Sequence, residues 1–427
     1  MIIKNMQLKS IREVKSLKGK RVILRADFNT PLKEIRERDK AKVIVTESTK
    51  IKETLPTLEF LIKKGAKVIL LSHLGRPEGR IVAGLRLNPV AQRLIELLGN
   101  KEKTEIKPYK SIKISPKTNF TYATDLINKK AEQLIGKMKD GDIVLLENTR
   151  FYPKELVGDS EFIAKLASYG DLYVDNAFAS SHRSEGTIVE ITKHLPSYAG
   201  FLLEKEINAL SKLIDNPKKS FVALIGGIKI STKIALMENL LTKVDHLCLG
   251  GGIANTFFKA MGYGVGDSEI EDSEIDLALK LLKIGAGKII LPADVITGDK
   301  KGNKVRIVEI KNEPFAICKK SEGIYDIGPE TIGKYALLIK QAETIIWNGP
   351  FGYFEVDQYK HGSIALGRII AARSRGTAFG VVGGGETISC LEQTGMAEFV
   401  DHISTGGGAM LTFLEGKGLP GITPLLK

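Results

Sequence analysis

Short runs of apolar and β-branched residues alternate with longer amphipathic stretches from one end of the chain to the other. This alternation is typical of βαβ units, and a succession of such units predicts parallel sheets with helices on both faces. Strands covered on both faces are apolar almost throughout, as in the sequences VILLS and IVLLE. The expected strands cover residues 21–26, 67–72, 142–146, 171–175, 221–225, 245–249, 288–291, 344–347 and 378–382, and the expected helices cover 51–64, 89–98, 233–243, 274–282 and 330–341.

The chain length predicts two cores rather than one. A chain of 427 residues, 43% of them apolar, exceeds the size at which a single core stops growing and suits two domains. We therefore expect an α/β protein with two doubly wound, parallel-sheet (Rossmann-like) domains. The sequence around residues 190–215 indicates the boundary, with one domain at 1–196, a second at 197–415, and a connecting hinge helix at about 201–213. A glycine-rich break precedes a short tail, 416–427.

Several features predict a cytoplasmic protein with no membrane partner. No apolar run approaches the ~18 residues that a membrane span needs. Residues 1–20 contain scattered lysines and no continuous apolar core of a secretory signal. Cys248, Cys318 and Cys390 lie far apart in the sequence, without the spacing of a metal site or a disulfide framework. Buried thiols in a reducing compartment are the interpretation we favour.

The charge balance leaves the class of partner open. The chain has 63 basic and 50 acidic residues, a net charge of +13, which would suit nucleic acid or small polyanionic substrates. The basic residues are spread along the chain, with no arginine-rich tail and no basic stretch interleaved with aromatic residues. We interpret most of them as solvated surface lysines and expect no nucleic-acid partner.

Polar residues follow the expected strands of the first half. In open parallel sheets, ligands bind beyond the carboxyl ends of the strands. Three arginines and a histidine arriving there from separate loops suit an anion with planar oxygens, such as a carboxylate or a phosphate. Any one of these arginines could equally well cap a helix or pair with a nearby glutamate. Such local roles explain all three arginines together much less well than a shared anion does. These candidates are Asp27, Asn29, His73, Arg76, Arg150 and Arg183.

Glycine runs follow the expected strands of the second half. Glycine lets the backbone approach a phosphate closely, and a helix N-terminus adds oriented N–H donors. Lys229 and Lys233 come just after the first glycine pair. If the helix begins near Ser231, Lys233 opposes the helix dipole in the first turn, which predicts an anionic partner. The runs are Gly226-Gly227, Gly250-Gly251-Gly252, Asn348-Gly349-Pro350-Phe351-Gly352, Gly383-Gly384-Gly385-Glu386-Thr387 and Thr405-Gly406-Gly407-Gly408.

Two common nucleotide-binding motifs are absent from the strand–helix junctions of the sequence. We find no complete G-x4-G-K-[ST] motif, and no G-x-G-x-x-G fingerprint between an expected strand and an expected helix. These absences argue against a P-loop enzyme and a dinucleotide dehydrogenase. Asn348, Pro350 and Glu355, together with the first glycine pair, remain suited to cradle a nucleotide.

Six segments, taken in order, resemble the motifs of phosphoglycerate kinases. They lie in the family's order and run from residue 25 to residue 409, so the resemblance covers nearly the whole chain. Their ordered set is far more specific than any one of them. The segments are Arg25-Ala26-Asp27-Phe28-Asn29-Thr30-Pro31, Ser72-His73-Leu74-Gly75-Arg76-Pro77, Leu145-Leu146-Glu147-Asn148-Thr149-Arg150-Phe151, Gly226-Gly227-Ile228-Lys229-Ile230-Ser231-Thr232-Lys233, Trp347-Asn348-Gly349-Pro350 and Ser404-Thr405-Gly406-Gly407-Gly408-Ala409.

The resemblance implies reversible, Mg2+-dependent phosphoryl transfer between 1,3-bisphosphoglycerate with ADP and 3-phosphoglycerate with ATP. It implies that Asp27, Asn29, His73, Arg76, Arg150 and Arg183 hold the phosphoglycerate, that Lys229 contacts nucleotide phosphate, and that Lys233 stabilises the transferring group. It further implies a nucleotide site formed by Gly226, Gly227, Gly251, Gly252, Asn348, Pro350, Glu355, Gly384, Gly385 and Thr387, with Gly251 and Gly252 bordering the adenine, Glu355 on the ribose, and Gly406 and Gly407 facing the phosphates.

The chemistry agrees with such a site. Phosphoryl transfer needs in-line positioning, with cations and N–H donors on the equatorial oxygens, and no covalent protein intermediate. Two substrates in separate domains must be brought together with water excluded, which implies hinge closure about the 201–213 segment. The resemblance also implies a monomer.

Four positions depart from the family pattern. Lys50 stands in place of an arginine, and we assign it a catalytic contact. Lysine keeps the positive charge of arginine but lacks its planar, two-pronged set of donors. Glu386 stands in place of a metal-binding aspartate and becomes the expected metal ligand, with a longer reach. Thr232 replaces a common aspartate, and Glu185 a common histidine. Two alternatives stay open: a catalytically impaired paralogue that binds nucleotide or phosphoglycerate, and, less favoured, a nucleic-acid-binding protein.

Overall fold

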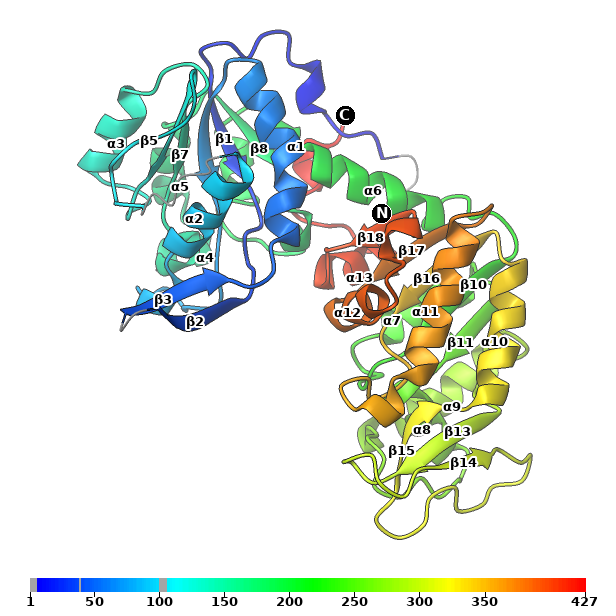
Figure 1. Cartoon of the computed structure of the whole chain (residues 1–427). Coiled ribbons are helices and arrows are strands. Elements are labelled where there is room, and N and C mark those ends of the chain that lie inside the picture. Colours follow the sequence, from blue (N-terminus) through cyan, green and yellow to red (C-terminus); the bar gives the residue numbers. More distant parts are fainter. Residues whose placement is uncertain (1–5, 38–39, 100–105) are drawn as a thin grey trace. The chain divides into compact units, whose positions relative to one another are not determined.

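The computed structural model describes residues 6–37, 40–99 and 106–427 and divides into two compact units (Figure 1). The first-half unit comprises residues 6–208 together with 418–427, and the second-half unit comprises residues 209–417. The division falls inside helix α6 (Phe201–Ile214). The expectation that residues 1–20 contain no leader falls partly outside the described residues, since 1–5 are not among them.

The sheet of the first-half unit has seven strands in the order β5-β6-β7-β4-β1-β8-β9. The strands from β6 to β9 pair in parallel, whereas β5 pairs antiparallel to β6 at the edge. The four strands predicted in this half occupy its centre. Their bounds are β1 (Arg21–Arg25), β4 (Lys67–Leu71), β5 (Ile112–Ser115), β6 (Thr118–Tyr122), β7 (Ile143–Leu145), β8 (Leu172–Asp175) and β9 (Ser197–Ala199).

Alternate side chains of these strands enter separate cores on the two faces of the sheet. Leu24 and Leu70 pack in one core with α1 (Thr49–Lys63) and α2 (Asn88–Leu97). Ile23 and Ile69 pack in the other, with α3 (Lys129–Gly136) and α5 (Ser160–Ala167). All four side chains are fully buried, and each such burial stabilises the fold by ~1.5–3 kcal/mol. The double coverage explains why these strands are apolar at every position.

Further segments of the first-half unit lie outside the predicted elements. An antiparallel hairpin joins β2 (Leu32–Glu37) to β3 (Lys40–Val45), and a short helix, α4 (Pro153–Leu156), precedes α5. The end of the chain packs on this unit: the backbone N–H of Lys9 donates to the carbonyl of Leu425 at 2.8 Å, and that of Gly421 donates to Ser181 at 2.9 Å.

The sheet of the second-half unit has six parallel strands in the order β12-β11-β10-β16-β17-β18. The parallel sheets of both units confirm the predicted α/β class. The strands are β10 (Phe221–Ile225), β11 (His246–Leu249), β12 (Ile289–Ile290), β16 (Thr344–Asn348), β17 (Phe379–Gly383) and β18 (His402–Ser404), and the helices are α7 (Ile234–Leu241), α8 (Gly251–Ala260), α9 (Ile275–Ile284), α10 (Pro329–Gln341), α11 (His361–Ser374), α12 (Gly385–Gln393) and α13 (Gly408–Leu414).

Helices α10, α11 and α12 cover one face of this sheet (Figure 1). Leu224 and the fully buried Trp347 belong to this core together with Tyr335 and Ile370 of the helices. A three-stranded antiparallel sheet, β14-β13-β15, accompanies the parallel one, with β13 at Asp294–Gly298, β14 at Arg306–Glu309 and β15 at Gly323–Ile327. Among the residues that the structure describes, no helix has the length and apolarity to span a membrane.

Candidate active site

The carboxyl ends of β1 and β4 hold a cluster of polar residues in the first-half unit. Asp27 accepts a hydrogen bond from the backbone N–H of Asn29 at 2.9 Å, and the Asn29 side-chain oxygen accepts one from the N–H of Gly75 at 2.9 Å. Lys50, in the first turn of α1, places its Nζ 2.8 Å from Oδ2 of Asp27. The structure therefore brings three of the predicted residues, Asp27, Asn29 and Lys50, into one connected group.

The Asp27 carboxylate is charged throughout the physiological pH range. Burial opposes its ionisation, but the positive charge of Lys50, the neighbouring His73 and the Asn29 N–H outweigh burial and lower its pKa to about 2. Lys50 is thereby held by a permanent anion beside the cluster, at the position where the family pattern has an arginine.

His73 is a neutral hydrogen-bond donor in this cluster. Its side chain is only 4% exposed, and its Nδ1 lies 3.2 Å from a terminal nitrogen of Arg25. A guanidinium can only donate, so Nδ1 accepts and the ring proton resides on Nε2. Burial lowers the pKa of His73 well below its usual value, and Arg25 adds to this effect while Asp27 opposes it.

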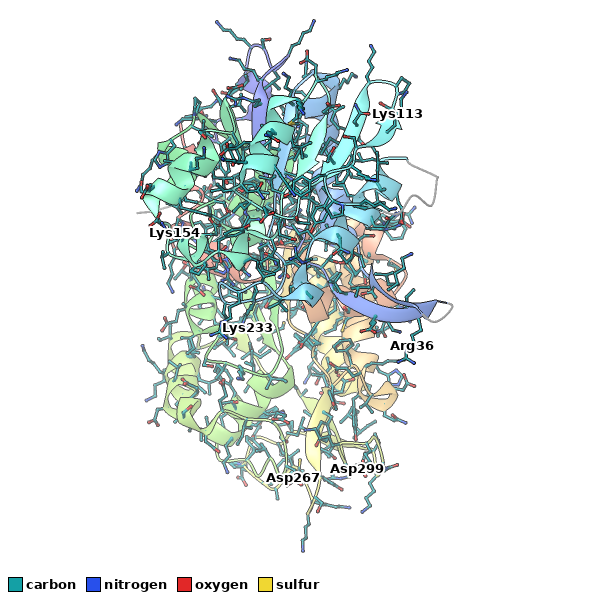
Figure 2. The ribbon with its side chains drawn as sticks, turned by 90° about the vertical axis from the view of Figure 1, so that its left-hand side faces the viewer. Arg36, Lys113, Lys154, Lys233, Asp267 and Asp299 are labelled. Atoms are coloured by element: carbon teal, nitrogen blue, oxygen red, sulfur yellow. The ribbon has the colours of Figure 1, made fainter. Side chains whose placement is uncertain are left out.

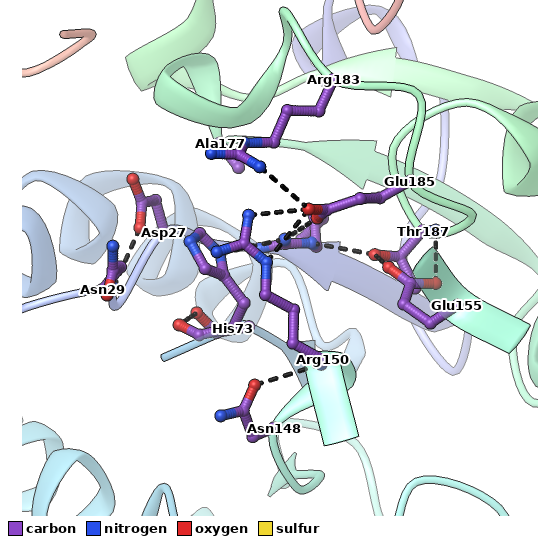
Figure 3. A network of polar contacts seen from close by, with 12 residues as sticks. Asp27, Asn29, His73, Asn148, Arg150, Glu155, Ala177, Arg183, Glu185 and Thr187 are labelled. Carbon is purple, nitrogen blue, oxygen red and sulfur yellow. Dashed lines mark hydrogen bonds and ion pairs between the residues drawn. The ribbon is translucent and has the colours of Figure 1, made fainter. Parts of the chain in front are cut away.

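Two of the three predicted arginines, Arg150 and Arg183, point at one carboxylate, that of Glu185 (Figure 3). Arg150 donates to Oε1 of Glu185 from Nε at 3.0 Å and from a terminal nitrogen at 2.7 Å, and its other terminal nitrogen donates to the carbonyl of Gly75 at 3.0 Å. Arg183 lies 3.5 Å from the same oxygen. The third predicted arginine, Arg76, is exposed to solvent.

Three helices of the second-half unit, α8, α12 and α13, have glycine both as the N-cap and as the first helical residue. Their N-cap residues are Gly250, Gly384 and Gly407. Gly384 has a φ of 97°, a conformation that favours glycine. A side chain at Gly385 would meet no atom within 4 Å, so this helix start opens onto empty space. Backbone N–H groups at such a start are available to an anion.

Lys233, labelled in Figure 2, lies just before α7 and not inside its first turn as the sequence predicted, because the helix begins at Ile234. Its Nζ donates to the carbonyl oxygen of Gly226 at 2.6 Å and to that of Asn348 at 3.1 Å. Burial lowers the pKa of Lys233 to about 8, against a smaller opposing effect of Glu386. Two carbonyl oxygens thus hold the ammonium group without neutralising it, and the anionic partner expected from the sequence stays a prediction.

A cavity of about 210 Å3 lies beside these glycine segments. Six predicted residues line it: Gly227, Gly251, Gly252, Pro350, Glu355 and Glu386. Ile228 and Gly352 of the lining lie within segments that the sequence analysis had marked. Sequence reasoning missed the other seven lining residues, which lie outside the glycine runs and motifs: Asn255, Glu269, Lys300, Ile324, Tyr325, Tyr353 and Phe354.

Two other predicted nucleotide residues, Asn348 and Thr387, do not line this cavity but bond neighbouring segments to one another. The Asn348 side-chain nitrogen donates to the carbonyl of Gly383 at 2.8 Å, and the buried Thr387 hydroxyl accepts from the N–H of Gly349 at 2.7 Å. These bonds connect β16 to the beginning of α12. Lys229 extends into solvent from the loop that follows β10.

The donor set fits Mg2+ only together with a nucleotide. The described residues contain no cluster of three or more acidic, histidine or cysteine side chains that could hold a metal ion by themselves. Glu386 is exposed at the start of α12 and lines the cavity. Magnesium is commonly held by one or two carboxylates and substrate phosphates, with water completing its shell, so one glutamate suffices.

Comparison with known proteins adds an independent observation. The family model described as phosphoglycerate kinase matches residues 11–417. The chain belongs to the phosphoglycerate kinase family. This membership confirms the resemblance seen in the motifs and places the chain among phosphotransferases with a carboxyl group as acceptor.

Named relatives of the family match along nearly the full length. The phosphoglycerate kinase of Pelotomaculum thermopropionicum is 42% identical over 99% of this chain and 100% of its own length, and that of Moorella thermoacetica is 42% identical over 96% and 97%. The structure of phosphoglycerate kinase from Coxiella burnetii matches with a TM-score of 0.81 at 35% identity, covering 98% of this chain and 99% of its own. That from Pyrococcus horikoshii matches with a TM-score of 0.79 at 28% identity, covering 98% of each chain.

Proposed function

We propose that this chain catalyses reversible phosphoryl transfer between 1,3-bisphosphoglycerate with ADP and 3-phosphoglycerate with ATP, using the clusters described above as its two substrate sites. One observation carries the assignment of roles: the ammonium group of Lys233 is held by two carbonyl oxygens beside a glycine-lined cavity, and no carboxylate is bonded to it. A partly buried cation of this kind suits negative charge that develops on a transferring phosphoryl group.

The first-half cluster is proposed to bind the phosphoglycerate. His73 presents an Nε2 donor, and Arg150, Arg183 and Arg76 supply cationic donors, which suit the carboxylate and phosphate of this substrate. The permanently charged Asp27 with Lys50 holds the neighbouring loop in place and offers acceptors for the substrate hydroxyl.

The second-half cavity is proposed to bind the nucleotide. Gly251 and Gly252 would border the base, Pro350 and Glu355 would line the pocket with Glu355 toward the ribose, and the N–H groups at Gly384 and Gly385 would face the phosphates. Lys229 would reach the phosphates from its loop. Negative phosphate oxygens favour the charged form of Lys233, so nucleotide binding should raise the pKa that burial lowers.

Magnesium is proposed as the accompanying ion, with Glu386 as the protein ligand. When bound, it supplies neutralisation of charge between the phosphates. Closure about helix α6, a monomeric state and a cytoplasmic location complete the proposal.

The test is ATP consumption by the purified protein with and without 3-phosphoglycerate, in Mg2+ and then in Mn2+, in a coupled assay that removes 1,3-bisphosphoglycerate. We expect turnover that requires 3-phosphoglycerate and is lost in Lys233→Ala. Normal nucleotide binding without turnover in either metal would contradict the proposal and indicate an impaired paralogue.

A further inference from the structure

Glu185 occupies the position in the first-half cluster where an anionic ligand would be expected. Its side chain is buried, with 6% of the residue exposed. Three guanidinium groups surround its carboxylate: Arg150 at 2.7 Å and Arg183 at 3.5 Å from Oε1, and Arg25 at 4.0 Å from Oε2. Figure 3 shows the first two pointing at it from separate segments.

Two neighbouring acids are less suited than Glu185 to balance the arginines. Burial raises the pKa of Glu155 to about 8, against the opposing bonds from Thr187 and the charge of Arg25, so it is largely neutral near pH 7. Burial also raises the pKa of Asp175 to about 6; this acid is mostly ionised near pH 7, but its Oδ1 accepts a hydrogen bond from the backbone N–H of Ala177. His182 stays neutral, because burial and Arg183 lower its pKa. Glu185 is therefore the acid that directly contacts the arginines.

The contacts of Glu185 are uneven between its two oxygens. Oε1 accepts both bonds from Arg150, whereas Oε2 has no hydrogen-bond partner among the described residues. Arg150 uses one edge of its guanidinium on Glu185 and one terminal nitrogen on the Gly75 carbonyl. The orientation of Arg150 is thus fixed before any substrate arrives, and some of its N–H donors remain for a second anion.

We propose that Glu185 is a resident counter-ion of the phosphoglycerate site: it orients Arg150 and weakens the attraction of the arginine cluster for the substrate's anionic groups. The inference rests on the proposed function of this cluster. Bound phosphoglycerate shares its arginines with a fixed negative charge, and like charges repel in a partly buried site. The consequence is weaker substrate binding and faster release than the arginines alone would give.

The test is Glu185→Gln, which keeps the size and the Oε1 acceptor but removes the charge. We expect the KM for 3-phosphoglycerate to fall by about tenfold, with an unchanged or lower kcat because release slows. Sulfate, used as a simple anion probe and measured by calorimetry, should bind more tightly to the variant by a similar factor. Binding of both anions should also become more dependent on salt.

The matched control is Glu322→Gln in the second-half unit. Glu322 accepts from Nε and a terminal nitrogen of Arg306 at 3.0 and 2.7 Å, so the variant removes the charge from a similar pair. We expect no change in its KM for 3-phosphoglycerate. Glu185→Asp, which keeps the charge, should leave sulfate affinity close to that of the native chain.

Three results would overturn the inference. A raised or unchanged KM in Glu185→Gln would show that Glu185 is a structural partner or a direct substrate ligand. Tighter sulfate binding in Glu185→Asp equal to that in Glu185→Gln would rule out charge as the cause. Equal sulfate affinity in Glu185→Gln and the native chain would also rule out charge as the cause. The sulfate measurement remains informative even if the native chain shows no turnover. Absence of turnover would count against the proposed function and not against this inference.

Discussion

Nζ of Lys233 lies 2.6 Å from the carbonyl oxygen of Gly226 and donates a hydrogen bond to it. The same group donates to the carbonyl of Asn348, so two backbone oxygens from neighbouring strands hold the ammonium. Burial lowers its pKa to about 8. The lysine is positioned by the fold rather than by an acidic partner, and its charge is available to a ligand.

Replacing Lys233 by alanine should therefore affect turnover far more than nucleotide binding. We expect kcat to fall by about 10²–10³-fold or more, because the charge matters mainly when negative charge develops on the transferring group. The Kd for ATP should rise only severalfold. Coupled kinetics and calorimetric titration measure the two quantities, and equal losses in both would show that Lys233 binds the ground state.

Stability should depend on pH in a defined direction at the same residue. The folded pKa of Lys233, about 8, lies below the ordinary lysine value of 10.5, so the unfolded chain holds the proton more tightly between these values. The native chain then gains stability as pH rises through this window. Lys233→Met lacks this gain, so its stability relative to the native chain should fall by about 2 kcal/mol between pH 7 and pH 9.5.

Calorimetric unfolding of both proteins at the two pH values measures this difference. Lys229→Met is the control, because it removes an exposed lysine of the same loop. A pH-independent difference for Lys233→Met would mean that the ammonium is not desolvated by the fold.

Lys50→Arg should keep or increase activity. Lys50 is bonded to Asp27 at 2.8 Å, and a guanidinium can retain this contact while offering further planar donors to the substrate. Lys50→Met should instead lower kcat/KM for 3-phosphoglycerate, because Asp27 loses its counter-ion. Steady-state kinetics of both variants decide the point: a large fall in Lys50→Arg would show an active site built specifically around lysine.

Gly385→Ala separates phosphate binding from folding. An added Cβ meets no atom within 4 Å, and alanine favours a helix by up to about 1 kcal/mol over glycine. We expect unchanged or slightly higher thermal stability with a KM for ATP raised about tenfold, because the methyl group obstructs the approach of a phosphate. Gly333→Ala in α10 also meets no atom within 4 Å and should leave KM unchanged. An unaltered KM in Gly385→Ala would remove this helix start from the phosphate site.

Glu386→Asp and Glu386→Gln test the metal ligand. Aspartate keeps the charge with a shorter reach, so we expect activity to persist with an altered preference between Mg2+ and Mn2+. Glutamine removes the charge and should raise the Mg2+ concentration needed for half-maximal rate by at least about tenfold. Metal titrations at saturating ATP measure this, and an unchanged requirement in Glu386→Gln would exclude Glu386 as a ligand.

The sequence predicted the central strands well because both of their faces are covered. β1, β4 and β10 agree with expectation to within a residue, since continuous apolar runs mark them. The hairpin β2–β3 and strand β14 escaped prediction for the opposite reason. The segment Leu32–Glu37 is rich in charge, and Ile307 of β14 is 60% exposed, so neither carries the apolar run that signals a buried strand.

The placement of candidate site residues was predictable where a local motif marks them, and less so where tertiary contacts define their environment. Asp27, His73 and Lys233 were chosen as candidates from their positions after strands, and the structure places them there. Glu185 was visible as a departure from the family pattern, but its bonds to Arg150, 35 residues earlier, arise only in the fold. Arg25 was missed as a member of the cluster, although a basic residue ending the buried strand β1 was a usable signal.

The segment 418–427 belongs to the first-half unit, although it is synthesised after the whole of the second-half unit. The first-half unit therefore cannot form its Gly421 and Leu425 contacts until every strand of the second-half unit has been synthesised. Domains usually fold in the order of synthesis, but here the part made first is completed last. Quality control that acts on incomplete chains would find the unfinished surface on the part made earliest.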